Sequence, residues 1–508
     1  MIKFAGSWPV CKKIFSHKIA PIITGVCVGV SVWLAGYMLV MRFAHLTNGF
    51  QYDELYSAVT ASPALSFGFV WKNMLLRDVN LPLFNILLFL WNRIFPFTQV
   101  SMHLFSALLG TAALAAAWLL APAYWSNLKK WIYVSLLSCS FILVGYGAIV
   151  RTYSLSVLLT VSFSLLALRL IDTLSRGENP SAARWLIFFF IGLLGSYSHY
   201  FCSGLFFITA LVVFIYACFY KVGRAWSFWG TGVVFALWCL WAVVKTFRFF
   251  VPAGTGGAGS GTQEWWFSTP VAKATFDTLL FLFGSITLFQ IITFCTLVTL
   301  CLWALSYKRA LFKQADMILP LAQIGLLIGV VALVSLRVNL WMDRYFLPLL
   351  PALFILVSGL LDYLQKNAKL FLILWPLLLW SWVQVYWTQE YLWWPEYTGL
   401  QDAFVHLTQV RRTKKVLVDT ANTGYPLEAL KQMLAYYVPK DYALTIEPLT
   451  KENISQSWMK DVPVLLPLCS QIHMMLFSAT YQVEEDKPLL LFHRDICVFT
   501  VHQVTNKG

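Results

Sequence analysis

The chain has 508 residues, of which 59% are hydrophobic and only 12% are charged, and its mean hydropathy is +0.69. Soluble globular domains carry ~25% charged residues, so this composition excludes a soluble enzyme and indicates a polytopic membrane protein. The net charge of +14 does not indicate a nucleic-acid partner, because the Lys and Arg residues fall in short clusters between apolar runs, as they do in cytoplasmic loops.

The N-terminal part predicts one span followed by a long outer loop. Residues 1–18 carry four Lys residues and are expected to stay in the cytoplasm. The apolar run 19–41 can cross a hydrocarbon core of ~30 Å and is too long for a cleaved signal peptide. Residues 42–98 then form an outer loop. Within this loop the run 81–96 (LPLFNILLFLWNRIFP) is short for a span and suits an interfacial or re-entrant helix.

The apolar runs that follow predict ten more spans, eleven in all. If 81–96 stays outside the membrane, every later cytoplasmic loop carries at least two basic residues, whereas counting it as a span breaks this pattern. The predicted fold is therefore a polytopic α-helical membrane domain over residues 19–390. Its later spans are 99–123, 131–150, 153–170, 185–200, 202–220, 226–247, 276–303, 316–336, 345–361 and 370–388.

Residues 391–508 predict a small extracytoplasmic α/β domain, because the composition changes there. KKVLVD (414–419) reads as a buried strand, and DYALTI, VPVLLPL and LLLFHRDICVFTV read as further strands. Residues 426–438 have helical spacing. Cys469 and Cys497 can pair if this tail is extracytoplasmic, and the sequence alone leaves that open.

Polar residues on the predicted outer face form a small set. Adjacent carboxylates beside a membrane, such as Asp53 and Glu54, cost free energy unless they are hydrated, paired with cations or part of a functional site. Cations on this face oppose the positive-inside trend, so their presence there needs another explanation, such as pairing with the carboxylates or binding an anion. Arg is suited to phosphate because its planar guanidinium group can bind two oxygens at once. The set contains Asp53, Glu54, Lys72, Arg77, Asp78, Asn80, Arg151, Tyr153, His199, Tyr200, Arg337, Asp343, Arg344 and Tyr345.

Three of these residues also have a purely structural interpretation. Arg151, between two spans, can be an interfacial Arg whose head reaches the headgroups. Arg344 can be the ion-pair partner of Asp343. A lone His at the junction of two spans, such as His199, is often a satisfied helix-end residue.

Several motifs together resemble those of the C-type fold glycosyltransferases of the protein O-mannosyltransferase and aminoarabinose transferase kind. Asp53-Glu54 is similar to the Asp-Glu that opens the first outer loop of that family. The other matches are 78–84 (DVNLPLF) with D-x-H-P-P-L-Y-Y, 148–155 (AIVRTYSL) with Q-E-x-R-x-Y-x-L, 198–200 (SHY) with a Thr/Ser-His-Tyr turn, and 344–351 (RYFLPLLP) with R-Y-x-x-P-x-x-P. They cover roughly residues 20–390. The chain departs from the pattern at Asn80, where the family has His, at Leu81, where it has Pro, and before Arg151, where Gln-Glu is absent.

The resemblance implies transfer of a sugar from a polyprenyl-phosphate carrier to a hydroxyl of a lipid, glycan or protein on the outer face of a membrane. It also implies a juxtamembrane helix at 81–96. In this interpretation Asp53 is the base, Glu54 positions the acceptor or shares the base, and one base acting in line gives inversion. Cations would stabilise the leaving lipid phosphate. The donor-phosphate candidates are Arg151, Arg344, Lys72 and Arg77, and the substrate-positioning candidates are Asp78, Asn80, Tyr153, His199, Tyr200 and Tyr345.

No metal ligands are assigned and no cofactor is firmly predicted, although a divalent cation is compatible with this chemistry. The expected partners are the lipid-linked sugar, a hydroxyl acceptor and membrane lipid, with no nucleic acid. The expected location is a bacterial inner membrane, with the active site and the tail domain on the extracytoplasmic side.

The main alternative is a transporter or flippase of lipid-linked glycans or small molecules, which predicts acids or broken helices near the bilayer midplane in both halves. A non-catalytic membrane scaffold and a ligase or polymerase of envelope glycans are further alternatives.

Overall fold

The structure, a computed structural model, describes most residues from 20 to 220 and shorter ranges beyond. The described residues are 20–220 apart from 45, 48–49, 51 and 77–80; 271–282; 314–364 apart from 336–340 and 342; four short strands; and scattered residues in 232–244 and 408–449. The chain divides into two compact units. The first contains Met1–Ala44, Ser106–Lys245 and Thr269–Trp387, and the second contains His45–Phe105, Thr246–Ser268 and Thr388–Gly508.

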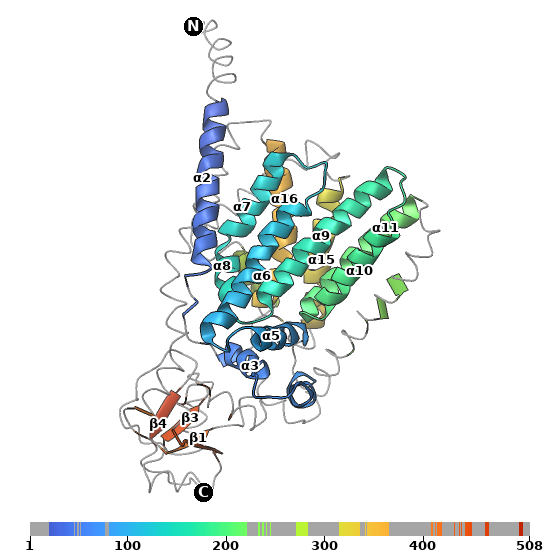
Figure 1. Cartoon of the computed structure of the whole chain (residues 1–508). Helices are drawn as coiled ribbons and strands as arrows, with labels where there is room; N and C mark the ends of the chain where they lie inside the picture. Colours follow the sequence, from blue (N-terminus) through green and yellow to red (C-terminus); the bar gives the residue numbers. More distant parts are fainter. Residues whose placement is uncertain are drawn as a thin grey trace, which may run out of the picture. The chain divides into compact units, whose positions relative to one another are not determined.

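The first unit is a bundle of long helices that lie side by side (Figure 1). In this bundle α16 packs on α7 and α15, α15 packs on α11, and α11 packs on α9 and α10, while α2 packs on α7. The bounds are α2 Ala20–Met41, α7 Asn127–Cys139, α9 Tyr153–Ser175, α10 Ala182–Ser196, α11 Tyr200–Phe219, α15 Ala315–Ser335 and α16 Leu350–Leu364.

The bundle core contains small hydroxyl residues that bond between helices. Gln323 of α15 is fully buried, and its Nε2 donates to Ser164 Oγ of α9 at 2.9 Å and to Thr209 Oγ1 of α11 at 2.7 Å. In a lipid bilayer the hydrophobic effect contributes little to the association of helices, so side-chain packing and interhelical hydrogen bonds of this kind hold them together. These two hydrogen bonds hold α15 against α9 and α11.

Apolar helices make the chain an integral membrane protein. Among the described residues five helices are long and apolar enough to cross a membrane, or six if the bent pair α7 and α8 (Phe141–Ala148) is one span. The five are Gln99–Leu119 (α6), Tyr153–Ser175, Tyr200–Phe219, Ala315–Ser335 and Asp343–Asp362. The helices predicted over 226–247, 276–303 and 370–388 lie largely outside the described residues, so the number eleven stays a prediction.

The helix predicted over 131–150 is not continuous. The chain breaks between α7 and α8 at Ser140, which has an extended backbone, and the two helices bend by 56°. A continuous apolar run hides this break. Its carbonyl groups at Leu137 and Leu143 accept hydrogen bonds from Arg42, so a side chain distant in the sequence stabilises the bend.

A buried ion pair joins α7 and α15. Lys129 is expected from the sequence to be one of the dispersed cytoplasmic cations, but the structure buries it, with 6% of its surface exposed, and pairs its Nζ with Asp316. Trp125 Nε1 also donates to the Asp316 carboxylate, at 3.1 Å, and Lys129 lies over the Trp125 ring at 4.4 Å. Lys129 therefore contributes to packing as well as to the charge bias of its loop.

The second unit begins with short helices in the predicted outer loop. These are α3 (Tyr52–Thr60), α4 (Phe67–Val70), a π-helical turn (Trp71–Leu75) and α5 (Leu83–Ile94). The short helix predicted within 81–96 is confirmed, and its twelve residues are too few for a span, which needs ~20. α3 packs on α5, and Asn92 Nδ2 of α5 donates to Ala61 O at 3.1 Å. This contact holds the C-terminal end of α3, the helix that carries Asp53 and Glu54 in its first turn.

The same unit contains a four-stranded mixed sheet of order β2-β1-β3-β4. A strand occurs in or next to each of the four predicted segments: β1 Lys415–Val418, β2 Thr445–Pro448, β3 Pro463–Leu466 and β4 Cys497–Thr500. β2 begins only at the end of DYALTI (441–446). β1 runs parallel to β2 and β3, and β3 runs antiparallel to β4. Most of the helix predicted over 426–438, together with Cys469, lies outside the described residues, so that helix and a Cys469–Cys497 disulfide stay predictions.

Candidate functional site

Three predicted site residues come together where helices of the first unit begin. Arg151 lies in the turn before α9, His199 precedes α11, and Arg344 lies in the 3-10 helix Asp343–Leu349 that leads into α16. Thr152, next to Arg151, donates a hydrogen bond to Ser198 O, and the ring of Tyr345, next to Arg344, lies 5.1 Å from the ring of His199. The structure therefore brings together three polar segments that are far apart in the sequence. We call Arg151, His199 and Arg344 the cationic cluster.

His199 is held as a neutral hydrogen-bond donor. Its Nδ1 accepts from the backbone N–H of Phe201 at 3.2 Å, which caps α11 and leaves the ring proton on Nε2. Nε2 is buried and has no partner among the described residues. Burial, followed by the two positive charges of Arg151 and Arg344, lowers the pKa of His199 to about 3. A buried N–H without a hydrogen-bond partner is rare in folded proteins. This one belongs to the same cluster as the two arginines.

Hydrogen bonds between the turns fix this arrangement. Thr152 Oγ1 donates to Ser198 O at 2.8 Å, and so joins the turn of Arg151 to the turn of His199. Ser203 Oγ donates to Ser196 O at 2.8 Å. Gly195 allows the close approach, because a Cβ there would overlap the ring of Phe206 in α11. The family-like Ser-His-Tyr turn thus depends on a glycine that precedes it.

The 3-10 helix contributes Arg344 to the cationic cluster and Tyr345 to the contact with His199. Asp343 is not simply the ion partner of its neighbour: its carboxylate accepts from Thr278 Oγ1, which in turn accepts from Trp341 Nε1 at 2.7 Å. The Tyr345 ring lies 5.1 Å from the His199 ring and 5.3 Å from the Tyr200 ring, centre to centre. The rings of these three residues form an aromatic wall beside the cations. Tyr153 is the first residue of α9.

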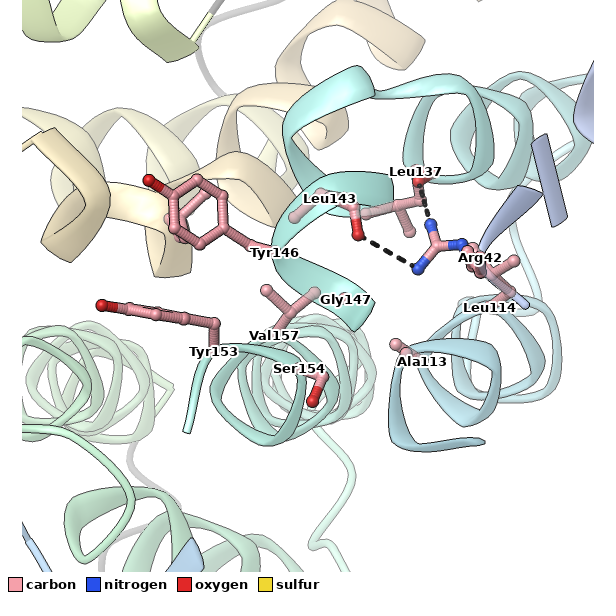
Figure 2. A pocket seen from close by; sticks show the side chains of 12 residues that line it. Arg42, Ala113, Leu114, Leu137, Leu143, Tyr146, Gly147, Tyr153, Ser154 and Val157 are labelled. Carbon is pink, nitrogen blue, oxygen red and sulfur yellow. Dashed lines mark hydrogen bonds between the residues drawn. The ribbon is translucent and has the colours of Figure 1, made fainter. Parts of the chain in front are cut away.

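A second buried arginine in the first unit was not predicted from the sequence. Arg42, with 2% of its surface exposed, donates to Leu143 O at 3.3 Å and to Leu137 O at 3.0 Å, and it lines a narrow cavity with Tyr146 and Tyr153 (Figure 2). Burial lowers the pKa of Arg42 to about 10, so the group stays charged at neutral pH. A single Arg directly after the first apolar run, on the predicted outer face, was the available signal.

Glycines make room for this guanidinium. A Cβ at Gly110 would lie 2.9 Å from Arg42 Nη1, and a Cβ at Gly147 would lie 3.1 Å from it. The cavity leaves about 10 Å³ for a water-sized molecule, which is the room of roughly one water. The cavity is therefore too small for a sugar or a phosphate group, and Arg42 acts on the bend between α7 and α8.

In the second unit, the predicted carboxylates occupy the first turn of α3. Asp53 is half-buried, whereas Glu54 is fully buried. Glu54 Oε1 lies 3.3 Å from Nε2 of His103, a residue of α6 that is 2% exposed. His103 was also missed by the sequence analysis, because it stands alone in an apolar run. A Glu that directly contacts the acceptor, one of the roles expected above, fits poorly with this burial.

The remaining predicted residues divide into two groups. Lys72 is exposed on the π-helical turn, whose Asn73 side chain bonds back to Phe69 O. Arg77, Asp78 and Asn80 lie outside the described residues, as does Arg337, so their roles stay predictions. No group of three or more His, Cys, Asp or Glu that can hold a metal ion occurs among the residues that the structure describes, and a divalent cation also stays a prediction.

Chemically, the cationic cluster can bind an anion. Two guanidinium groups carry positive charge near one neutral N–H. Arg151 and His199 are buried and Arg344 is half-buried, and charge-assisted hydrogen bonds are strong in such surroundings. Arginine forks match the oxygens of a phosphate group.

Comparison of the whole chain with solved structures decides the fold. The structure matches ArnT from Cupriavidus metallidurans in the apo state with a TM-score of 0.51, over 93% of this chain and 98% of that one, at 11% sequence identity. The chain has the ArnT fold. The ArnT structure bound to undecaprenyl phosphate also matches, with a TM-score of 0.49, 12% identity and coverage of 92% and 98%.

A third match is the archaeal oligosaccharyltransferase AglB from Archaeoglobus fulgidus, in complex with an inhibitory peptide and a dolichol-phosphate, with a TM-score of 0.47, 11% identity and coverage of 86% of this chain and 69% of that one. No family model and no curated protein matches the sequence. The ArnT fold agrees with the resemblance seen in the motifs, and at this identity it describes architecture alone.

Proposed function

We propose that the protein is a membrane glycosyltransferase that takes a sugar from a polyprenyl-phosphate carrier. The observation that carries the proposal is the unpartnered Nε2–H of His199, buried within reach of the charges of Arg151 and Arg344. Such an arrangement is suited to an anion and not to a neutral or cationic ligand. The ArnT fold of the chain supports a lipid-linked anion over a soluble one.

In the proposed reaction the cationic cluster holds the phosphate of the carrier. When the bond between the anomeric carbon and the phosphate oxygen breaks, negative charge develops on that oxygen. Fixed guanidinium groups and the His199 N–H stabilise this charge without rearrangement. Tyr153, Tyr200 and Tyr345 are proposed to line the binding site of the polyprenyl-phosphate sugar. Lys72 and Arg77 are further candidates for the phosphate.

The acceptor hydroxyl must lose a proton as it attacks the anomeric carbon. We assign Asp53 as the base, because its carboxylate is half-buried at the first turn of α3 and a carboxylate within hydrogen-bond reach suffices for this step. The hydroxyl oxygen forms the new bond, the carrier phosphate leaves with the bonding electrons, and Asp53 takes the proton. A single displacement of this kind inverts the anomeric carbon. Asp78 and Asn80 are proposed to position the acceptor.

The reaction is proposed to take place on the extracytoplasmic side of a bacterial inner membrane. The acceptor is a hydroxyl of an envelope lipid, glycan or protein. The charge pattern supports this side, because it places Lys-rich segments such as 1–18 in the cytoplasm. A divalent cation can take part if the residues outside the described ranges supply its ligands.

A transporter or flippase of lipid-linked glycans is the second candidate. The broken pair α7 and α8, bent by 56°, favours it, because broken helices mark the binding sites of many transporters. However, Arg42 already occupies the carbonyls near this break. A flippase moves a labelled lipid across a vesicle membrane and leaves its sugar attached, whereas the proposed enzyme releases free polyprenyl phosphate.

The proposal is tested with purified full-length protein and a set of polyprenyl-phosphate sugars. Asp53→Asn and Arg151→Gln are each expected to lower transfer at least about a hundredfold, since each removes a group that acts on the transition state. The matched control is Arg176→Gln, because Arg176 forms an exposed pair with Asp172 in α9 and is expected to leave transfer unchanged. Unchanged turnover in Asp53→Asn would remove Asp53 from the role of base.

A further inference from the structure

A buried acid and a buried imidazole face each other in the second unit. Glu54 of α3 is 0% exposed and His103 of α6 is 2% exposed, and 3.3 Å separate Glu54 Oε1 from His103 Nε2. Ionisable residues in apolar surroundings are expensive unless they are paired. The Glu54–His103 pair between α3 and α6 is therefore a candidate for a role beyond side-chain packing.

The second ring nitrogen determines what this pair can be. His103 Nδ1 lies 3.0 Å from the backbone oxygen of Gln99, one turn earlier in α6. A carbonyl oxygen only accepts, so Nδ1 must carry a proton. Nε2 then faces Glu54 either as a bare acceptor, with the proton on the carboxyl group, or as N–H, with the carboxylate ionised. In both cases the pair holds one shared proton and has no net charge.

Aromatic residues cover the pair. Phe50 stacks on the His103 ring with a distance of 5.2 Å between ring centres and an angle of 22°. Tyr436, from the C-terminal part of the second unit, lies 5.3 Å from the Phe50 ring and 5.8 Å from the Phe97 ring. Phe50 is 1% exposed. Water is thus kept away from a hydrogen-bonding pair, which strengthens it.

We propose that His103 is a positioning residue for Asp53. The inference rests on the proposed function, in which Asp53 is the base. Neighbouring residues of a helix project about 100° apart, so anchoring Glu54 to His103 fixes the rotation of the short helix α3 and with it the direction of the Asp53 side chain. The pair also neutralises Glu54, which would otherwise place a second negative charge beside the base.

Two polar side chains of α5 bond to the segment that follows α3. Asn92 Nδ2 bonds to Ala61 O at 3.1 Å, and Arg93 Nη2 donates to Leu65 O at 3.0 Å while lying over the Phe89 ring. These bonds fix the end of α3 and the loop that follows it. The contact with His103 fixes the other end, where the carboxylates lie.

The first test does not depend on the proposed function. Full-length protein labelled with ¹⁵N-histidine is studied in lipid bilayers by solid-state NMR near neutral pH, and His103→Gln identifies the signals of His103. We expect Nδ1 to be protonated, and we expect Glu54→Gln to leave Nε2 bare, because the Gln amide can donate to it. A bare Nδ1 in the wild type, or a protonated Nε2 in Glu54→Gln, would overturn the pair.

The second test is kinetic. His103→Phe keeps the volume and removes the anchor, so kcat is expected to fall at least about tenfold while the KM for the donor changes less than about twofold. His103→Gln keeps an N–H that can reach Glu54 and is expected to recover at least about a third of the wild-type kcat. Phe105→Leu, at a buried contact of α6 with Phe84 and Trp91, is the control for lost packing and is expected to stay within about twofold.

The outcomes separate the two proposals. A wild-type protein that transfers no sugar from any polyprenyl-phosphate donor contradicts the proposed function, and the NMR result then decides alone whether the pair exists. Active wild type with an unchanged kcat in folded His103→Phe contradicts the positioning role and leaves the proposed function standing. Equal losses in His103→Phe and His103→Gln would also contradict it, since the conservative variant keeps the contact.

Discussion

The ring of His199 lies 5.1 Å from the ring of Tyr345, and this contact joins the start of α11 to the 3-10 helix before α16. Arg344, next to Tyr345, thereby comes near enough to lower the pKa of His199, as does Arg151. Three segments that the sequence offers as separate polar islands form one cationic cluster.

His199→Phe is expected to weaken the binding of a polyprenyl phosphate about tenfold or more, because a hydrogen bond to a charged group contributes about 1.5–3 kcal/mol. His199→Gln retains a side-chain N–H and should bind more tightly than His199→Phe. Displacement of a fluorescent polyprenyl phosphate from detergent-solubilised protein measures both. Equal affinities for His199→Phe and the wild type would exclude His199 as a donor to the phosphate.

His199 also predicts a loss of stability in acid. Its pKa of about 3 in the folded chain lies below the ordinary value of ~6.5, so protonation favours the unfolded chain. Its contribution is therefore complete above about pH 6.5 and decreases as the pH falls toward 3, by about 2 kcal/mol at pH 5. Thermal unfolding at pH 8 and pH 5 should show a smaller acid shift for His199→Phe than for the wild type. The same shift in both proteins contradicts this prediction.

Gly195→Ala is expected to destabilise the turn that carries His199. The new Cβ would overlap the Phe206 ring, and overpacking of this kind typically costs about 1–3 kcal/mol. The double variant Gly195→Ala with Phe206→Leu should recover part of the loss. Melting temperatures of the two variants measure this, and a Gly195→Ala protein as stable as the wild type would show that α10 and α11 are not in close contact here.

The Lys129–Asp316 pair predicts a large asymmetry between single and double replacement. Removing one partner of a buried pair leaves an uncompensated charge and costs about 3–5 kcal/mol, so Lys129→Met should lower the melting temperature strongly. Lys129→Met with Asp316→Leu should be much less damaging. Arg176→Met, which breaks an exposed pair with Asp172, should cost less than about 1 kcal/mol. Similar losses in Lys129→Met and Arg176→Met would contradict burial of the Lys129 pair.

The sequence predicted the helices better than the contacts. Long apolar runs indicate spans because of length alone, and a polar residue between two runs, such as Arg151 or His199, must lie near a helix end. The bend at Ser140 was missed, because the residues around it are as apolar as those of a straight helix. It is stabilised by Arg42, which lies about a hundred residues away in the sequence.

Residues buried by distant partners were missed for the same reason. His103 stands alone in an apolar run, and its partner Glu54 belongs to the preceding loop. Lys129 reads as an ordinary loop cation, because Asp316 neutralises it only in the folded bundle. Periodicity and charge counts contain no information on such pairs, whereas the motif resemblance correctly indicated the architecture that the ArnT fold shows.

The most direct test is an experimental structure of the full-length protein with a bound polyprenyl phosphate in lipid nanodiscs. We predict density for the phosphate group within hydrogen-bond distance of His199 Nε2 and between the guanidinium groups of Arg151 and Arg344. A phosphate bound at another place, with His199 Nε2 still without a partner, would contradict the account.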